Sequence, residues 1–121
     1  MEETLSQALE VIIKGKLINI VFQPIVSLRD GKVLGYESLS RTPSNNIIKN
    51  PEILFETATK NKVLFDLESI SRQKTINLAK DFILSTNTYK LFLNVNTNIV
   101  DDPRFERGFT HNLMKEVGIK P

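Results

Sequence analysis

The chain has no cysteine, one histidine and little net charge, and each of these features narrows what it can do. Without cysteine it has neither a disulfide framework nor a thiolate metal site. Sixteen lysines and arginines against 14 aspartates and glutamates leave a net charge of +2. This excess is too small to predict a nucleic-acid polymer or a membrane surface as a partner.

The sequence also lacks a long apolar run. No stretch approaches the roughly 18 apolar residues of a membrane-spanning helix. The first residues, Met1 to Thr4, are acidic where a secretory signal would be basic. We therefore expect a cytoplasmic protein without a membrane segment. At 121 residues and 40% hydrophobic composition, the chain can bury one core of the size usual for a single domain.

The first third of the sequence predicts a helix followed by a β-hairpin. Thr4 and Gln7 have the spacing of a capping box, and Gly15 is the expected end of the helix. Residues 18–26 are rich in β-branched and aromatic residues and predict a strand. Asp30-Gly31 is a strong hairpin signal, which makes the next strand, 33–41, antiparallel to the first.

Two helices, a strand and a last helix are expected after the hairpin. Asn50-Pro51-Glu52 has the composition of a helix start, and a longer helix is predicted over about 65–84. Its acids Asp66 and Glu68 suit the positive end of the helix dipole. Its expected buried stripe is Leu67, Ile70, Leu78, Ala79 and Phe82.

The third strand is predicted at 90–95 and the last helix at 102–118. Helices between non-adjacent strands indicate an α/β layer or barrel. A helical crossover returns the chain in the same direction, so the third strand is expected to be parallel to the second.

The three predicted strands carry polar side chains at positions where an apolar side chain would cost less free energy to bury. Because strand side chains alternate between faces, Glu37, Leu39 and Arg41 share one face and Ser38 and Ser40 share the other. Asn94 interrupts the apolar third strand, on the same face as Phe92 and Asn96. A carboxylate, a guanidinium and an amide on apolar strands predict a metal and phosphate site at the strand ends.

These segments resemble, in their order and in their residue types, the N-terminal half of the EAL domain family, the cyclic di-GMP phosphodiesterases of bacteria. The resemblance is carried by Gln23-Pro24-Ile25, by Glu37-Ser38-Leu39-Ser40-Arg41 and by Asn94-Val95-Asn96. Gln23 stands 14 residues before Glu37, and Asn94 stands 57 residues after it. The five-residue motif alone would be a weak signal, but the three segments at this spacing are a strong one.

The resemblance implies a TIM-like barrel whose first strand is antiparallel to the rest. Such barrels have eight strands and about 200–250 residues. Residues 1–121 are therefore expected to be the N-terminal portion of one EAL domain, truncated before the fourth barrel strand, with an α/β partial-barrel fold. An open sheet edge and an uncovered apolar face would favour self-association, which we expect to give a symmetric homodimer.

The resemblance also implies roles for five residues. Glu37 and Asn94 would bind the catalytic Mg²⁺ or Mn²⁺, Arg41 would bind a phosphate, Gln23 would contact the nucleotide, and Leu39 would line its pocket. Each has a plainer alternative. Glu37 could pair with Arg41 or another cation, Arg41 could be solvated, and Asn94 could bond loop backbone. Gln23 could be an ordinary polar residue near a strand end, and Leu39 could simply pack.

The activity implied for the complete domain is metal-dependent hydrolysis of cyclic di-GMP to the linear dinucleotide. The remaining acidic ligands and the general-base lysine of the family lie further C-terminal, so the 121-residue chain itself is expected to be inactive. Two other functions stay open: a non-catalytic cyclic di-GMP receptor and an interaction module. The sequence departs from the family at Ser38, which replaces an alanine, at Asn96, which replaces a serine, and at Thr42-Pro43, which replaces an aromatic residue.

Overall fold

The computed structural model of the chain describes residues 4–81 and 89–93, and its element order is helix, hairpin, two helices and a strand. The sheet has the order β1-β2-β3, with β1 antiparallel to β2 and β2 parallel to β3. This is the predicted α/β partial barrel with an antiparallel first strand. The elements are α1 (Leu5–Gly15), β1 (Asn19–Val26), β2 (Val33–Arg41), α2 (Pro51–Lys60), α3 (Leu64–Ala79) and β3 (Lys90–Phe92).

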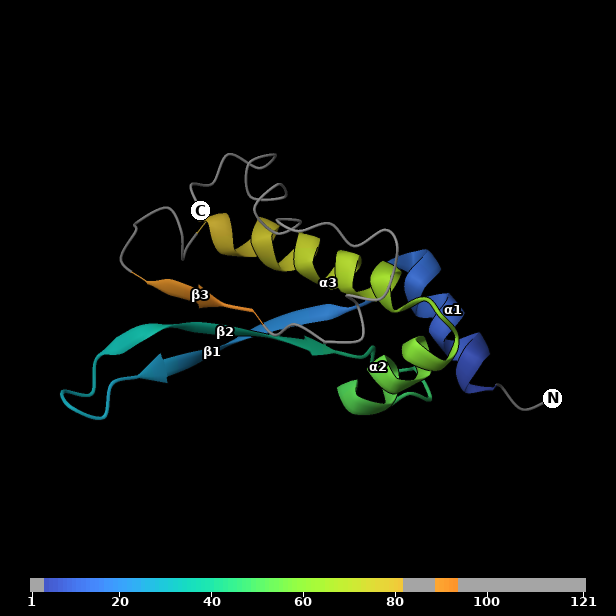
Figure 1. Cartoon of the computed structure of the whole chain (residues 1–121), viewed down its shortest axis with the longest axis horizontal. Coiled ribbons are helices and arrows are strands. Elements are labelled where there is room, and N and C mark those ends of the chain that lie inside the picture. The colour runs from blue at the N-terminus through green and yellow to red at the C-terminus, as the bar shows by residue number, and fades with distance from the viewer. Residues whose placement is uncertain (1–3, 82–88, 94–121) are drawn as a thin grey trace.

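The helices gather at the end of the sheet where β2 ends, and α3 runs along one sheet face (Figure 1). The hairpin loop protrudes at the opposite end. None of the helices in the described part of the chain has the length and apolar character that a bilayer crossing requires. The predicted last helix, 102–118, lies outside the described residues.

The turn between β1 and β2 forms where Asp30-Gly31 predicted it. The Ser27 amide donates to the Lys32 carbonyl at 2.8 Å, and the Lys32 amide donates to Asp30 Oδ1 at 3.0 Å. Gly31 has φ +72°, a left-handed conformation in which a side chain would be strained. The resulting register places Gln23 directly opposite Glu37.

Helix α1 begins as predicted but ends differently. The Gln7 amide donates to Thr4 Oγ1 at 3.1 Å and the Thr4 amide donates to Gln7 Oε1 at 2.8 Å, which completes the capping box. The left-handed residue at the other end is Lys16, with φ 50°, and not the expected Gly15. A Cβ on Gly15 would lie 2.9 Å from the Leu17 side chain, so the glycine makes room for that leucine.

The hydrophobic core lies among the three helices and the start of β1. Its fully buried members include Leu9, Ile12, Ile18, Leu54 and Leu67. The buried Asn46 ties the loop after β2 to this core, because its amide donates to the Ala8 carbonyl at 3.3 Å and its Oδ1 accepts from the Ile48 amide at 2.8 Å.

The buried face of α3 differs from the predicted apolar stripe. Leu67 and Ala79 are buried as expected, but Leu78 is 47% exposed and Phe82 lies outside the described residues. The α-helix spans Leu64–Ala79, and the last residues of the predicted range 65–84 lie outside the described residues. Glu68 and Thr75 are also buried on this helix, and a search for an apolar stripe does not detect polar residues of this kind.

Hydroxyl pairs join α3 to one face of β2. Ser38 Oγ lies 2.6 Å from Thr75 Oγ1, and Ser40 Oγ lies 2.5 Å from Ser71 Oγ. Because strand side chains alternate, Glu37 and its neighbours in register lie on the opposite sheet face. We call this opposite side the far face; it carries Val21, Gln23, Glu37, Leu39 and Phe92.

Candidate functional site

Three side chains form a row across the far face at the level of Glu37. Gln23 on β1 is its antiparallel partner, and Phe92 on β3 is its parallel partner. Directly paired strand residues on one face have Cβ atoms about 4.5–5.5 Å apart. The fold therefore brings the predicted Gln23 and Glu37 together, although they are 14 residues apart in the sequence.

The Glu37 carboxylate is half-buried and makes no hydrogen bond or ion pair with any residue that the structure describes. The alternative pairing with Arg41 is not observed. Residues four apart on a strand are separated by about 13 Å along its axis. The Arg41 guanidinium instead donates to the Ser40 carbonyl at 3.2 Å, at the exposed end of β2. Glu37 thus remains available for a ligand.

A hard divalent metal ion suits the Glu37 carboxylate, since Mg²⁺ and Mn²⁺ prefer oxygen ligands. Within residues 4–81 and 89–93, no three histidine, cysteine, aspartate or glutamate side chains lie close enough together to hold a metal. Glu37 therefore fits as one ligand of such an ion but does not form a site with its described neighbours. The second predicted ligand, Asn94, lies outside the described residues.

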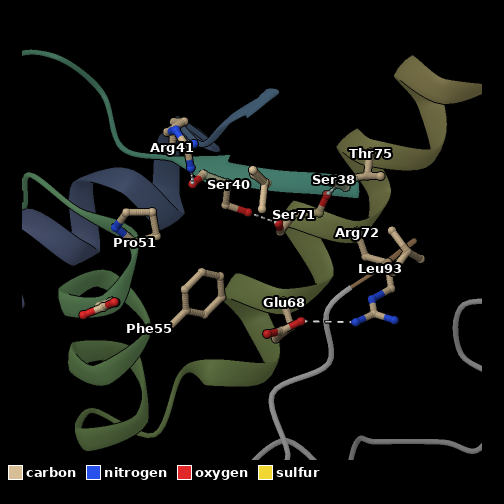
Figure 2. A pocket seen from close by; sticks show the side chains of 12 residues that line it. Ser38, Ser40, Arg41, Pro51, Phe55, Glu68, Ser71, Arg72, Thr75 and Leu93 are labelled. Carbon is tan, nitrogen blue, oxygen red and sulfur yellow. Dashed lines mark hydrogen bonds and ion pairs between the residues drawn. The ribbon is translucent and has the colours of Figure 1, made fainter. Parts of the chain in front are cut away.

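A cavity of about 500 Å³ lies between the end of β2 and helices α2 and α3. In Figure 2, Phe55 from α2 and Glu68 and Arg72 from α3 point toward this space beneath β2. Of the predicted site residues, Leu39 and Arg41 line the cavity, whereas Gln23 and Glu37 do not. The full lining is Ser38, Leu39, Ser40, Arg41, Pro51, Glu52, Phe55, Glu68, Ser71, Arg72, Thr75 and Leu93.

The cavity contains a buried ion pair. Arg72 Nη2 donates to Glu68 Oε2 at 3.3 Å, and the two side chains are only 10% and 8% exposed. Burial raises the pKa of the Glu68 carboxyl above its ordinary value, and the nearby Arg72 guanidinium opposes this rise. Oε2 is the only carboxylate oxygen of Glu68 with a hydrogen bond to the described residues.

The prediction that Glu68 serves as a helix-start acid is wrong. Glu68 faces inward because it lies one turn from both Leu64 and Arg72 on the buried side of α3. Arg72 was not predicted as a site residue at all. The available signal was the spacing of four residues between Glu68 and Arg72, with the acid first, which allows an ion pair on one side of the helix.

Comparisons with known proteins agree with the resemblance in the sequence. The family described as "EAL domain" matches residues 2–121. A solved structure, described as a crystal structure of the FimX EAL domain, is similar with a TM-score of 0.75 and 20% sequence identity. The similarity covers 100% of this chain and 49% of that chain, so this chain spans about half the length of the FimX structure. At this identity the likeness supports the fold alone.

No curated protein compared with the chain matches it. The family match extends over nearly all of the 121 residues and includes all three segments that carry the sequence resemblance. The chain therefore belongs to the EAL domain family.

Proposed function

We propose that the chain contributes a cyclic di-GMP binding site at the C-terminal end of β2. The complete domain would hydrolyse this dinucleotide to its linear form, whereas these 121 residues alone would bind it without appreciable turnover. The proposal is supported by the family membership, by the cavity that Leu39 and Arg41 line at the end of β2, and by the Glu37 carboxylate on the far face, which has no partner among the described residues.

The observation that carries the proposal is the carboxylate inside the cavity. Glu68 Oε1 has no hydrogen bond to the described residues, so it can accept N–H groups from a ligand. Guanine presents N–H donors on one edge, and the negatively charged Oε1, with two lone pairs, can accept a charge-assisted hydrogen bond from that edge. A volume of about 500 Å³ lies within the usual range for small-molecule sites.

Phe55 supplies a surface on which the base could stack. Its ring lies across the cavity from Glu68 in Figure 2 and is half-buried. Stacking of a nucleic-acid base on an aromatic side chain contributes about 1–3 kcal/mol. Together, Phe55 and Glu68 would select a planar base with N–H donors on its edge.

The remaining predicted residues take roles on the rim and on the far face. Arg41 has a planar guanidinium suited to a phosphate group, and it is one of the residues that line the cavity. Gln23, directly opposite Glu37, would contact the nucleotide, and Leu39 would line its pocket. Glu37, with Asn94, would hold Mg²⁺ or Mn²⁺.

When bound, such a metal ion supplies a Lewis acid for a phosphate oxygen and an activated water. The described residues provide one carboxylate for this ion and no cluster of acids around it. We therefore assign hydrolysis to the complete domain and binding to this chain. Chromatography of cyclic di-GMP incubated with the chain and Mg²⁺ should show no linear product.

Isothermal titration of the 121-residue chain with cyclic di-GMP tests the binding. We expect saturable binding that Glu68→Gln weakens by at least about tenfold, because a neutral amide is a weaker acceptor for the N–H donors of the base than a carboxylate and also loses the ion pair with Arg72. Lys14→Gln, which removes a charge from an exposed ion pair on α1, is the matched control and should bind as the unchanged chain does. Equal affinity for cyclic di-AMP, or no binding at all, would contradict the proposal.

A further inference from the structure

The ion pair in the cavity is buried, unlike two other ion pairs on the helices. Glu68–Arg72, Glu10–Lys14 and Glu56–Lys60 share the spacing of four residues on a helix. The side chains of the Glu10 and Glu56 pairs are all at least 60% exposed, whereas those of Glu68 and Arg72 are at most 10% exposed. Exposed helical pairs contribute little, but removal of one partner from a buried pair leaves an uncompensated charge.

Arg72 is the charged group that acts on Glu68. Glu52 on α2 and Arg41 on β2 also line the cavity. The pKa of Glu68 is nevertheless governed by burial, which raises it, and by Arg72, which lowers it through its charge and its hydrogen bond. Without Arg72, burial would act unopposed and the carboxyl would hold its proton to higher pH.

We propose that Arg72 is a positioning residue for ligand binding: it holds Glu68 Oε2 and keeps the carboxylate ionised, so that Oε1 can accept hydrogen bonds from the ligand. This inference rests on the proposed cyclic di-GMP site. An ionised carboxylate accepts hydrogen bonds at both oxygens, whereas a protonated one uses an oxygen as a donor. A base edge that consists of N–H donors would therefore bind the ionised form.

The first test needs no ligand and follows the Glu68 carboxyl carbon by NMR during a pH titration of the full chain. Arg72→Gln should raise the Glu68 pKa by about one unit or more, as expected when an adjacent cation is removed. Arg72→Lys should retain part of the effect, and Lys14→Gln should leave the Glu68 pKa unchanged. An unchanged Glu68 pKa in folded Arg72→Gln would overturn the inference.

The second test measures the affinity for cyclic di-GMP at two pH values. At a pH below the Glu68 pKa that the NMR titration gives for the unchanged chain, Arg72→Gln should bind more weakly by the factor that the measured rise in pKa sets, tenfold per unit. At a pH well above the Glu68 pKa measured in both proteins, the difference should fall to within about threefold. A loss of equal size at both pH values, or no loss at either, would show that Arg72 does not act through the charge of Glu68.

The two tests separate this inference from the proposed function. If the unchanged chain does not bind cyclic di-GMP, the proposed function fails, while the NMR titration still decides whether Arg72 keeps Glu68 ionised. If Arg72→Gln does not fold, as judged by circular dichroism, Arg72→Met takes its place in both measurements, because it also removes the charge while keeping a long side chain. A raised Glu68 pKa in this variant supports the role of the charge, and an unchanged Glu68 pKa contradicts it.

Discussion

At the scale of single residues, adjacent positions on β2 have opposite surroundings. Glu37 lies on the far face without a partner among the described residues, while Ser38 points at α3 and bonds Thr75. The alternation of strand side chains explains this division, and it was predictable from the sequence. The partners of Ser38 and Ser40 were not, because they lie 37 and 31 residues away along the chain.

The Ser38–Thr75 pair should respond unequally to the loss of its two hydroxyls. The Thr75 hydroxyl donates to the Ser71 carbonyl at 2.8 Å, so Ser38 is the donor to Thr75. Ser38→Ala leaves Thr75 bonded and should cost about 0.5–1 kcal/mol of unfolding free energy. Thr75→Val leaves the buried Ser38 hydroxyl unpaired and should cost about 1–3 kcal/mol. Chemical denaturation of both variants measures the two losses of unfolding free energy. A larger loss in Ser38→Ala than in Thr75→Val would contradict the prediction.

Burial of Glu68 makes stability depend on pH. Because its pKa is raised in the folded chain, its contribution is fully present below the unfolded pKa and is lost as pH rises through the folded pKa. Arg72→Gln should raise the pKa of Glu68 in the folded chain further, so that more unfolding free energy is lost as the pH rises. The unfolding free energy of the variant should therefore fall short of that of the unchanged chain by more at about pH 7 than at about pH 4.5, by roughly 1.4 kcal/mol per unit of pKa. Urea denaturation at both pH values measures it, and a deficit independent of pH would contradict the prediction.

At the scale of elements, the hairpin depends on glycine at two positions for different reasons. Gly31 needs a positive φ in the loop, with open space around it. Gly35 is buried on β2, where an added Cβ would lie 2.1 Å from the Lys90 carbonyl oxygen of β3. The turn was recognisable from Asp30-Gly31, but the close approach at Gly35 was not, because it depends on a strand 55 residues later.

Gly35→Ala should therefore destabilise the chain more than Gly31→Ala. The first variant must push β3 away from β2 and is expected to lose about 3 kcal/mol, at the upper end for overpacking. The second places a side chain in the left-handed region and should lose about 1–2 kcal/mol. Hydrogen exchange of the β3 amides adds a specific readout, since only Gly35→Ala should speed their exchange. Equal exchange in the two variants would contradict the assigned cause.

At the scale of the whole molecule, the far face exposes apolar side chains beside charged ones. Val21 and Phe92 are each 41% exposed, and Glu37 and Arg41 stand two positions on either side of Leu39. A two-fold packing of this face on a second copy would set Glu37 of each chain near Arg41 of the other, with Leu39 close to the axis. The exposed apolar side chains of the far face are the reason for expecting a homodimer, and a ligand bound at Glu37 or Arg41 would compete with it.

Light scattering after size-exclusion chromatography tests this expectation. The unchanged chain should elute as a dimer, and Val21→Glu should shift it toward monomer because a charge would be buried in the contact. Val11→Glu is the matched control, since Val11 is 51% exposed on α1, away from the far face. Monomeric behaviour of the unchanged chain at all concentrations would contradict the prediction.

The sequence by itself determined the features that depend on neighbouring residues: the capping box of α1, the hairpin turn, the proline start of α2 and the division of β2 between two faces. Their causes are local sterics and short-range hydrogen bonds. Only the tertiary structure decided that Glu68 and Arg72 lie buried in a cavity and that Gln23 faces Glu37. Burial and cross-strand register depend on which distant segments pack together, and the apolar pattern of α3 does not encode that packing.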